Sequence, residues 1–175
     1  MSGATISNTL TDFYLKKLKT VKALVFDFDG VFTNGNIYVS DDGSFFRSTN
    51  VKDGYAINKA VKLGYPIAVI SGGSSEGVVR RLNRLGVDDV FIQVKDKVKV
   101  LHSWLEKNNL QASECLVMGD DVPDAKILKM VGFSCSPADA VAEIRSFVDF
   151  VSSKNGGEGC VREVVEAKLR LDGHW

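Results

Sequence analysis

The sequence predicts an α/β fold: a three-layer, doubly wound parallel sheet that forms a single domain over residues 1–175, with an inserted β-hairpin and no cap domain. Two observations support this prediction. Five short apolar runs, rich in Val, Ile and Phe, show little alternation, as strands buried on both faces do. Stretches with helical periodicity separate most of these runs, and strands that alternate with helices form parallel sheets.

The predicted elements can be placed in chain order from their apolar spacing and their end signals. The strands comprise residues 23–28, 67–70, 90–92, 115–118 and 131–135. The helices between them comprise residues 53–63, 74–85, 96–107 and 124–131. Short polar side chains cap helices at the N-terminus, so the expected caps are Asp53, Ser74 and Asp96. Glycine often ends a helix, and the expected ends are Gly64, Gly86 and Gly132.

Three further segments complete the predicted domain. Residues 36–40 and 44–48 alternate in β fashion around Asp41-Asp42-Gly43, which is a hairpin signal. Residues 137–150 are predicted to form a helix capped by Ser136, and a glycine-rich turn then leads to a final helix over residues 161–169. Residues 1–20 are an N-terminal extension to this core.

Composition excludes several classes of partner. Lys plus Arg is 22 and Asp plus Glu is 22, so no net positive field attracts nucleic acid or anionic lipid. No apolar run is long enough to cross a membrane, and residues 1–10 are polar, unlike an export signal. The three cysteines show no metal-binding or disulfide spacing. We therefore expect a cytoplasmic protein with no nucleic-acid or membrane partner.

Acidic and anion-binding residues follow the predicted strands, where open parallel sheets bind their ligands. Asp27-Phe28-Asp29-Gly30 follows the first strand, and Ser71-Gly72-Gly73 follows the second. Asp96-Lys97 lies beyond the third, and Gly119-Asp120-Asp121-x-x-Asp124 follows the fourth. Carboxylates from two strands repel unless a cation lies between them, and all-oxygen ligation suits Mg²⁺. A fixed lysine and a hydroxyl supply what a phosphoryl group needs.

These four motifs, in this order, resemble those of the haloacid dehalogenase superfamily of Asp-dependent phosphatases. The resemblance implies that Asp27 is the nucleophile, and that Asp29 protonates the leaving alkoxide and then activates water. It implies phosphoryl-binding roles for Ser71 and Lys97. The implied Mg²⁺ ligands are the carboxylates of Asp27 and Asp120 and the backbone carbonyl of Asp29. Asp124 and Asp121 are the implied supporting acids, Asp124 as a partner of Lys97 or of a water on the metal.

The early hairpin, the Asn50-Val51-Lys52-Asp53-Gly54 segment and the terminal Gly156-Gly157-Glu158-Gly159 segment resemble the capless 3-deoxy-D-manno-octulosonate 8-phosphate phosphatases. This resemblance implies a phosphorylated eight-carbon sugar-acid substrate and a role in the synthesis of a lipopolysaccharide core sugar. It also implies that residues 36–48 assemble a homotetramer in which a neighbouring subunit covers each active site, with the terminal glycine-rich segment near the site of that neighbour. An isolated hairpin is only marginally stable, which favours assembly.

The residues predicted to bind the sugar acid are Lys52, Gly72, Gly73 and Thr33, with Arg47, Arg80 and Arg162 as weaker candidates. Many relatives carry Arg after the Ser/Thr-Gly of the second motif, where this chain has Gly73. Two alternatives remain at this stage. One is a phosphatase for a nine-carbon ulosonate 9-phosphate. The other is a phospho-accepting signalling or regulatory domain, against which Asp29 argues because it is placed to hydrolyse the acyl phosphate.

Overall fold

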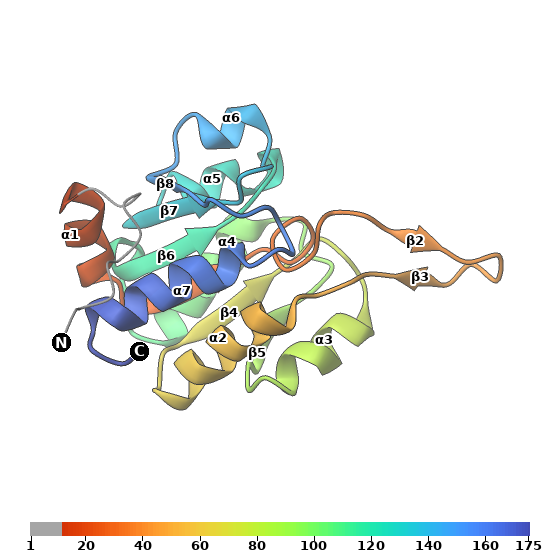
Figure 1. Ribbon diagram of the computed structural model, residues 1–175, viewed down its shortest axis with the longest axis horizontal. Helices are drawn as coiled ribbons and strands as arrows, with labels where there is room; N and C mark the ends of the chain where they lie inside the picture. Colours follow the sequence, from red (N-terminus) through yellow and green to blue (C-terminus); the bar gives the residue numbers. More distant parts are fainter. Residues whose placement is uncertain (1–11) are drawn as a thin grey trace.

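The computed structural model describes residues 12–175 (Figure 1). The first part of the predicted N-terminal extension, residues 1–11, lies outside the described residues. The remainder of that extension forms helix α1 (Asp12–Thr20), which the sequence analysis did not predict. None of the helices in residues 12–175 has the length and hydrophobicity needed to traverse a lipid bilayer.

A six-stranded sheet, parallel throughout, forms the centre of the domain, with strand order β5-β4-β1-β6-β7-β8. The strands are β1 (Ala23–Phe26), β4 (Ile67–Ile70), β5 (Asp89–Phe91), β6 (Cys115–Met118), β7 (Phe133–Ser136) and β8 (Phe150–Val151). All five predicted strands are present. From β1 the chain builds outward through β4 and β5, then crosses back to β6. The order therefore reverses beside β1, and such a reversal is where doubly wound sheets bind ligands.

Alternate residues of the strands face two separate cores, which confirms the three-layer prediction. Leu24 and Phe26 of β1 join the core beneath four helices: α1, α2 (Val51–Lys62), α3 (Glu76–Asn83) and α7 (Cys160–Leu171). Ala23 and Val25 join the core beneath α4 (Lys97–Lys107), α5 (Ala125–Leu128) and α6 (Ala142–Arg145). Because β1, β4 and β6 are apolar and buried on both faces, packing on both sides holds the ends of these strands in place.

The predicted hairpin is confirmed as β2 (Tyr38–Val39) paired antiparallel with β3 (Phe45–Phe46). Gly43 in its turn has φ +81°, a conformation that favours glycine. The hairpin projects away from the sheet (Figure 1). Its apolar side chains are exposed, from 57% for Tyr38 to 67% for Val39. No second domain accompanies it within residues 12–175.

The predicted helix over residues 137–150 is wrong. Only α6 is helical there, and Phe150 begins the sixth strand beside β7. The backbone of this segment bonds to other parts of the chain instead: the N–H of Ala138 donates to the carbonyl of Lys154, and that of Val141 donates to the carbonyl of Asp120. The predicted helix over residues 124–131 is also shorter, since a 3-10 turn η2 (Val122–Asp124) precedes α5. A similar turn, η1 (Ala112–Glu114), precedes β6.

The predicted N-cap at Asp53 is wrong. Asn50 caps α2, and its side chain accepts from the N–H of Lys52. Asp53 instead lies fully buried within the first turn, where its Oδ1 accepts a hydrogen bond from the backbone N–H of Arg162 at 2.7 Å. Asp53 thus connects α2 to α7 rather than starting a helix. At α3 the cap residue is Ser75 instead of Ser74, whereas the predicted cap Asp96 of α4 is confirmed.

Candidate active site

A cleft of about 800 Å³ lies beyond the carboxyl ends of the central strands. It brings together most of the predicted site residues, namely Asp27, Asp29, Ser71, Gly72, Gly73, Lys97, Asp120, Asp121 and Asp124. These residues come from four segments that each follow a strand, so the parallel sheet collects them at one edge. Lys52 and Thr33 are not among the residues that line the cleft.

Asp27 directly follows β1 and is held in a defined orientation. Its Oδ1 accepts a hydrogen bond from the N–H of Phe28 at 2.7 Å and lies 3.0 Å from the Lys97 ammonium. No hydrogen bond from residues 12–175 reaches its Oδ2, which is left to act as a nucleophile. Burial, together with the nearby charge of Asp124, raises the pKa of Asp27 to about 7, although Lys97 opposes the shift.

Lys97, the first residue of α4, is the buried cation of the site. Its Nζ donates to Asp124 Oδ1 at 2.6 Å and also lies 3.0 Å from Asp27 Oδ1. Burial alone would lower the pKa of Lys97, but the charges of Asp27 and Asp124 outweigh it and hold the pKa above its usual value. The ammonium is therefore a fixed positive charge beside Asp27, the predicted nucleophile.

Asp120 and Asp124 face the same point from the loop after β6. The Oδ2 of buried Asp124 accepts the backbone N–H of Asp120 at 3.2 Å. Burial and the charges of Asp124 and Asp121 raise the pKa of Asp120 to about 7. Gly30 lets this carboxylate approach, because a Cβ there would lie 2.0 Å from Asp120 Oδ2 and its φ is +82°. Asp120 Oδ1 is buried without a hydrogen-bond partner.

The acidic residues fit a hard cation. Carboxylate oxygens of Asp27, Asp120 and Asp124 lie within 4.8 Å of one another. Asp120 Oδ1 is buried without a partner, and the pKa values of Asp27 and Asp120 are both raised. Lys97 alone therefore does not balance the negative charge of this cluster. Oxygen ligands of this kind suit Mg²⁺. The Asp29 carboxylate lies outside the group, consistent with a metal-binding role for its backbone carbonyl only.

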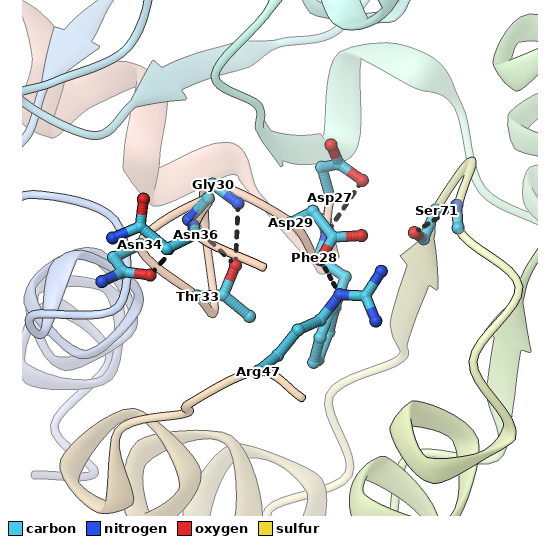
Figure 2. Close-up of polar contacts among 11 residues, drawn as sticks. Asp27, Phe28, Asp29, Gly30, Thr33, Asn34, Asn36, Arg47 and Ser71 are labelled. Atoms are coloured by element: carbon cyan, nitrogen blue, oxygen red, sulfur yellow. Dashed lines mark hydrogen bonds and ion pairs between the residues drawn. The ribbon is translucent and has the colours of Figure 1, made fainter. Parts of the chain in front are cut away.

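Asp29 forms an ion pair that was not predicted from the sequence. Arg47, the residue after β3, donates through Nε to Asp29 Oδ1 at 2.6 Å (Figure 2). The Arg47 side chain is 16% exposed, so the contact is largely shielded from solvent. The base of the hairpin thus fixes the carboxylate that is predicted to act as acid and base. Because 18 positions separate Arg47 from Asp29, no local sequence signal connects the two residues. Arg47 was predicted only as a weaker candidate for substrate binding.

Ser71 and the two glycines after it form the opposite wall of the cleft. Ser71 is buried, and its hydroxyl oxygen accepts the N–H of Gly73 at 3.0 Å. The hydroxyl hydrogen remains available to donate to a ligand, because accepting one bond does not use it. This arrangement suits the predicted contact with a phosphoryl oxygen.

Two predicted residues, Thr33 and Lys52, lie outside the cleft, and Asp121 lies at its exposed rim. Thr33 is fully buried, and its hydroxyl accepts the N–H groups of Gly30 and Gly35, so it holds the loop that follows Asp27 and does not face the cleft (Figure 2). Lys52 is exposed at the start of α2, away from the cleft. Asp121 is exposed at the rim, where it accepts the N–H of Val122.

The terminal glycine-rich segment packs against the loop that follows β1 in its own chain. The N–H of Gly157 donates to the carbonyl of Val31 at 2.9 Å. A Cβ on Gly156 would lie 1.9 Å from the carbonyl oxygen of Gly30. These glycines therefore support the loop that follows Asp27, a role that no local sequence signal indicated.

Comparison with known proteins now identifies the family. A family profile described as haloacid dehalogenase-like hydrolase matches residues 86–164. The chain is 30% identical over 172 residues to the 3-deoxy-D-manno-octulosonate 8-phosphate phosphatase of Salmonella typhi, covering 98% of this chain and 92% of that protein. This chain belongs to the 3-deoxy-D-manno-octulosonate 8-phosphate phosphatase family. The predicted superfamily and fold are therefore confirmed.

Solved structures of the same family agree. The phosphatase of that name from Yersinia pestis superposes with a TM-score of 0.92 at 28% identity, covering 94% of this chain and 89% of that one. The enzyme from Moraxella catarrhalis, solved with magnesium ion, phosphate ion and the sugar acid, has a TM-score of 0.90 at 30% identity, covering 94% and 95%. Mg²⁺ as the cofactor, predicted from the carboxylates, is thus supported by a family member that holds it.

Magnesium binding is expected to strengthen as pH rises. The pKa values of Asp27 and Asp120 are both raised to about 7. Below that pH the carboxyls of the metal-free protein hold protons, which Mg²⁺ must displace. The Kd should fall roughly tenfold per pH unit for each displaced proton as pH approaches about 7, and level off above it. Calorimetric titration across this range measures the slope, and a Kd that does not vary with pH contradicts the prediction.

Proposed function

We propose that this protein hydrolyses 3-deoxy-D-manno-octulosonate 8-phosphate to the free sugar acid and phosphate in a Mg²⁺-dependent reaction. The observation that carries the proposal is the convergence of Asp27, Lys97 and Asp120 in one cleft of a chain that aligns over 98% of its length with phosphatases of that name. The reaction belongs to the synthesis of a lipopolysaccharide core sugar. A phosphorylated sugar acid is accordingly the small-molecule partner of this site.

The residues divide the chemistry into two steps. Asp27 Oδ2 attacks phosphorus and forms an aspartyl phosphate, while the bond from phosphorus to the sugar oxygen breaks and Asp29 gives that oxygen a proton. Asp29 then removes a proton from a water, whose oxygen attacks phosphorus and releases phosphate and the Asp27 carboxylate. Asp29 is suited to both steps because Arg47 fixes its position beside the nucleophile.

Charge stabilisation comes from the rest of the cluster. The Lys97 ammonium and the Ser71 hydroxyl face the phosphoryl oxygens, on which negative charge is concentrated. Asp124 holds the ammonium at 2.6 Å and so fixes its direction. We propose that Mg²⁺ is bound by the carboxylates of Asp27 and Asp120 and by the Asp29 carbonyl, where it supplies neutralising charge to the phosphoryl group.

A direct comparison of substrates tests the proposed function. Phosphate release is measured from the eight-carbon 8-phosphate and from a nine-carbon ulosonate 9-phosphate, each with Mg²⁺ and with the metal chelated. Mg²⁺-dependent release with a clear preference for the eight-carbon substrate is expected. A preference for the nine-carbon acid contradicts the substrate assignment while leaving the mechanism in place.

We also propose that the hairpin assembles a homotetramer in which a neighbouring subunit covers the cleft. The exposed apolar side chains of β2 and β3 support this proposal, because a lone two-stranded ribbon with such a surface is poorly stabilised in water. The cleft itself is open in a single chain that has no cap domain. Closing it would exclude water and strengthen its electrostatic interactions.

Replacing Val39 and Phe45 by Ser is expected to dissociate this assembly. Both side chains are apolar, lie on the hairpin and are more than 60% exposed in the single chain. Light scattering should show a tetramer for the unmodified protein and smaller species for the double variant. Phe13→Ser is a matched control, since Phe13 on α1 is 61% exposed but lies outside the hairpin. A monomeric unmodified protein contradicts the proposal.

A cytoplasmic location is also proposed. All three cysteines, Cys115, Cys135 and Cys160, are free and buried. Free thiols persist where the environment is reducing, as it is in the cytoplasm.

A further inference from the structure

Arg47 lies beside the cleft, in contact with its lining residue Asp29, and the mechanism described above uses only part of this side chain. Its Nε donates to Asp29 Oδ1 at 2.6 Å, and its side chain is 16% exposed. Figure 2 shows the guanidinium lying between Asp29 and Ser71, with its terminal nitrogens turned away from the Asp29 contact. The side chain therefore reaches from the base of the hairpin to the wall of the cleft.

The opposite wall is shaped to accept this guanidinium. A Cβ on Gly73 would lie 3.8 Å from Arg47 Nη2 and 3.0 Å from Asp29 Oδ2. Gly73 does not have the positive φ that favours glycine. The absence of a side chain at this position therefore leaves room for its neighbours and is not required by the backbone conformation. An ordinary side chain at position 73 would crowd the Arg47–Asp29 pair.

Most of the hydrogen-bonding capacity of Arg47 is unused by the protein. A guanidinium carries five N–H donors in a planar fork. Within residues 12–175, Asp29 is the acceptor bonded to Nε, and no acceptor is bonded to Nη1 or Nη2. A largely shielded cation with free forked donors matches an oxyanion, above all a carboxylate.

The location of Arg47 indicates which anionic group of the substrate it would bind. The phosphoryl group belongs beside Asp27, Lys97 and Ser71, whereas Asp29 acts on the oxygen of the leaving sugar. Arg47 contacts Asp29 and so lies on the leaving-group side. An anion there is part of the sugar acid itself.

Other basic residues are placed less well for this task. Arg80 pairs with Glu76 at 3.5 Å and Arg162 pairs with Glu166 at 3.0 Å, and within residues 12–175 neither side chain pairs with a residue that lines the cleft, as Arg47 does with Asp29. Lys95 and Lys126 line the cleft, but both are exposed. Arg47 alone among these residues is both shielded and fixed to a predicted catalytic carboxylate.

We propose that Arg47 is a specificity-determining residue that binds the carboxylate of the sugar acid through Nη1 and Nη2 while its Nε holds Asp29. This inference rests on the proposed function, since it needs a substrate that carries a carboxylate besides its phosphate. The same side chain then recognises the correct leaving group and positions the residue that protonates it.

The test compares two substrates that present the same kind of primary phosphate: the eight-carbon 8-phosphate and ribose 5-phosphate, which has no carboxylate. In Arg47→Ala the ratio of the two kcat/KM values is expected to fall roughly 10- to 100-fold, mainly through a higher KM for the eight-carbon substrate. Arg47→Lys should keep part of the preference, because an ammonium retains the charge without the fork. Circular dichroism verifies that the variants fold.

A control and a transplant sharpen the result. Arg170 also pairs with a carboxylate, Glu166 at 2.7 Å, but lies on α7 outside the cleft, so Arg170→Ala should leave the ratio unchanged. In the double variant Arg47→Ala/Gly73→Arg, a guanidinium reaches the same space from the other wall. It should restore part of the lost preference, whereas Gly73→Arg alone should crowd Arg47 and lower it.

The outcomes separate failure of this inference from failure of the proposed function. An equal fall for both substrates, mainly in kcat, would mean that Arg47 only orients Asp29 and would overturn its recognition role. A preference that survives Arg47→Ala would overturn it as well. An unmodified protein that does not prefer the eight-carbon substrate would instead contradict the proposed function.

Discussion

Asp27→Asn is expected to reduce phosphate release by roughly 10⁴-fold or more, because an amide cannot attack phosphorus and no other residue can replace a missing nucleophile. The neighbouring geometry supports this size of effect. Asp27 is the carboxylate that both Lys97 and the Phe28 N–H hold in place at the end of β1. The measurement is the initial rate of phosphate release with saturating Mg²⁺.

The same substitution should leave the fold intact and make the metal-free protein more stable at pH 8. Burial raises the pKa of Asp27 from 3.8 to about 7, so its ionisation works against folding as pH rises through that interval. An uncharged Asn removes this effect and the repulsion with Asp124. Thermal unfolding without metal gives the comparison. Near-normal phosphate release from a folded Asp27→Asn protein would contradict its assignment as the nucleophile.

Lys97→Met is expected to lower turnover roughly 10³-fold and to destabilise the metal-free protein by about 3–5 kcal/mol. Lys97 is 8% exposed and is the cation in contact with both Asp27 and Asp124. Without it, buried carboxylates face one another unpaired. Because Lys97 also lowers the pKa of Asp27, its loss should shift the acid side of the pH–rate profile to higher pH.

Lys107→Met provides a matched control for the stability measurement. Lys107 lies 2.7 Å from Asp89, a distance like that between Lys97 and Asp124, but its side chain is 67% exposed. An exposed ion pair contributes about 1 kcal/mol or less. Denaturant unfolding of the two variants without metal should therefore differ clearly. Equal stability of the two variants would contradict the view that Lys97 offsets buried negative charge.

The central sheet and the main site residues could be predicted because their signals are local. Each buried strand is a continuous apolar run, and Asp27, Ser71 and Asp120 follow such runs directly. Parallel strands then place these residues at one edge without any knowledge of the helices between them. For the same reason Lys97, which begins a helix after β5, lies in the cleft as predicted.

The features that were missed depend on contacts between distant segments. Strand β8 contains two residues, which are too few to show a periodic pattern. The segment forms a strand because it pairs with β7. The Arg47–Asp29 ion pair depends on how the hairpin returns to the sheet. The burial of Asp53 depends on α7, more than 100 positions later in the chain. Side-chain partners of this kind are set by tertiary packing, which local propensity does not encode.

Trapping the covalent intermediate tests the central claim most directly. Asp29→Asn should form the aspartyl phosphate from p-nitrophenyl phosphate, whose leaving group departs without the proton that Asp29 supplies, but hydrolyse it slowly, because the residue that activates water is missing. The variant is mixed with p-nitrophenyl phosphate and Mg²⁺, quenched in acid, digested and examined by mass spectrometry. We predict a phosphoryl group on Asp27, absent when the metal is chelated and absent from the Asp27→Asn/Asp29→Asn double variant. A phosphoryl group on another residue, or none at all, would contradict Asp27 as the nucleophile of a Mg²⁺-dependent phosphatase.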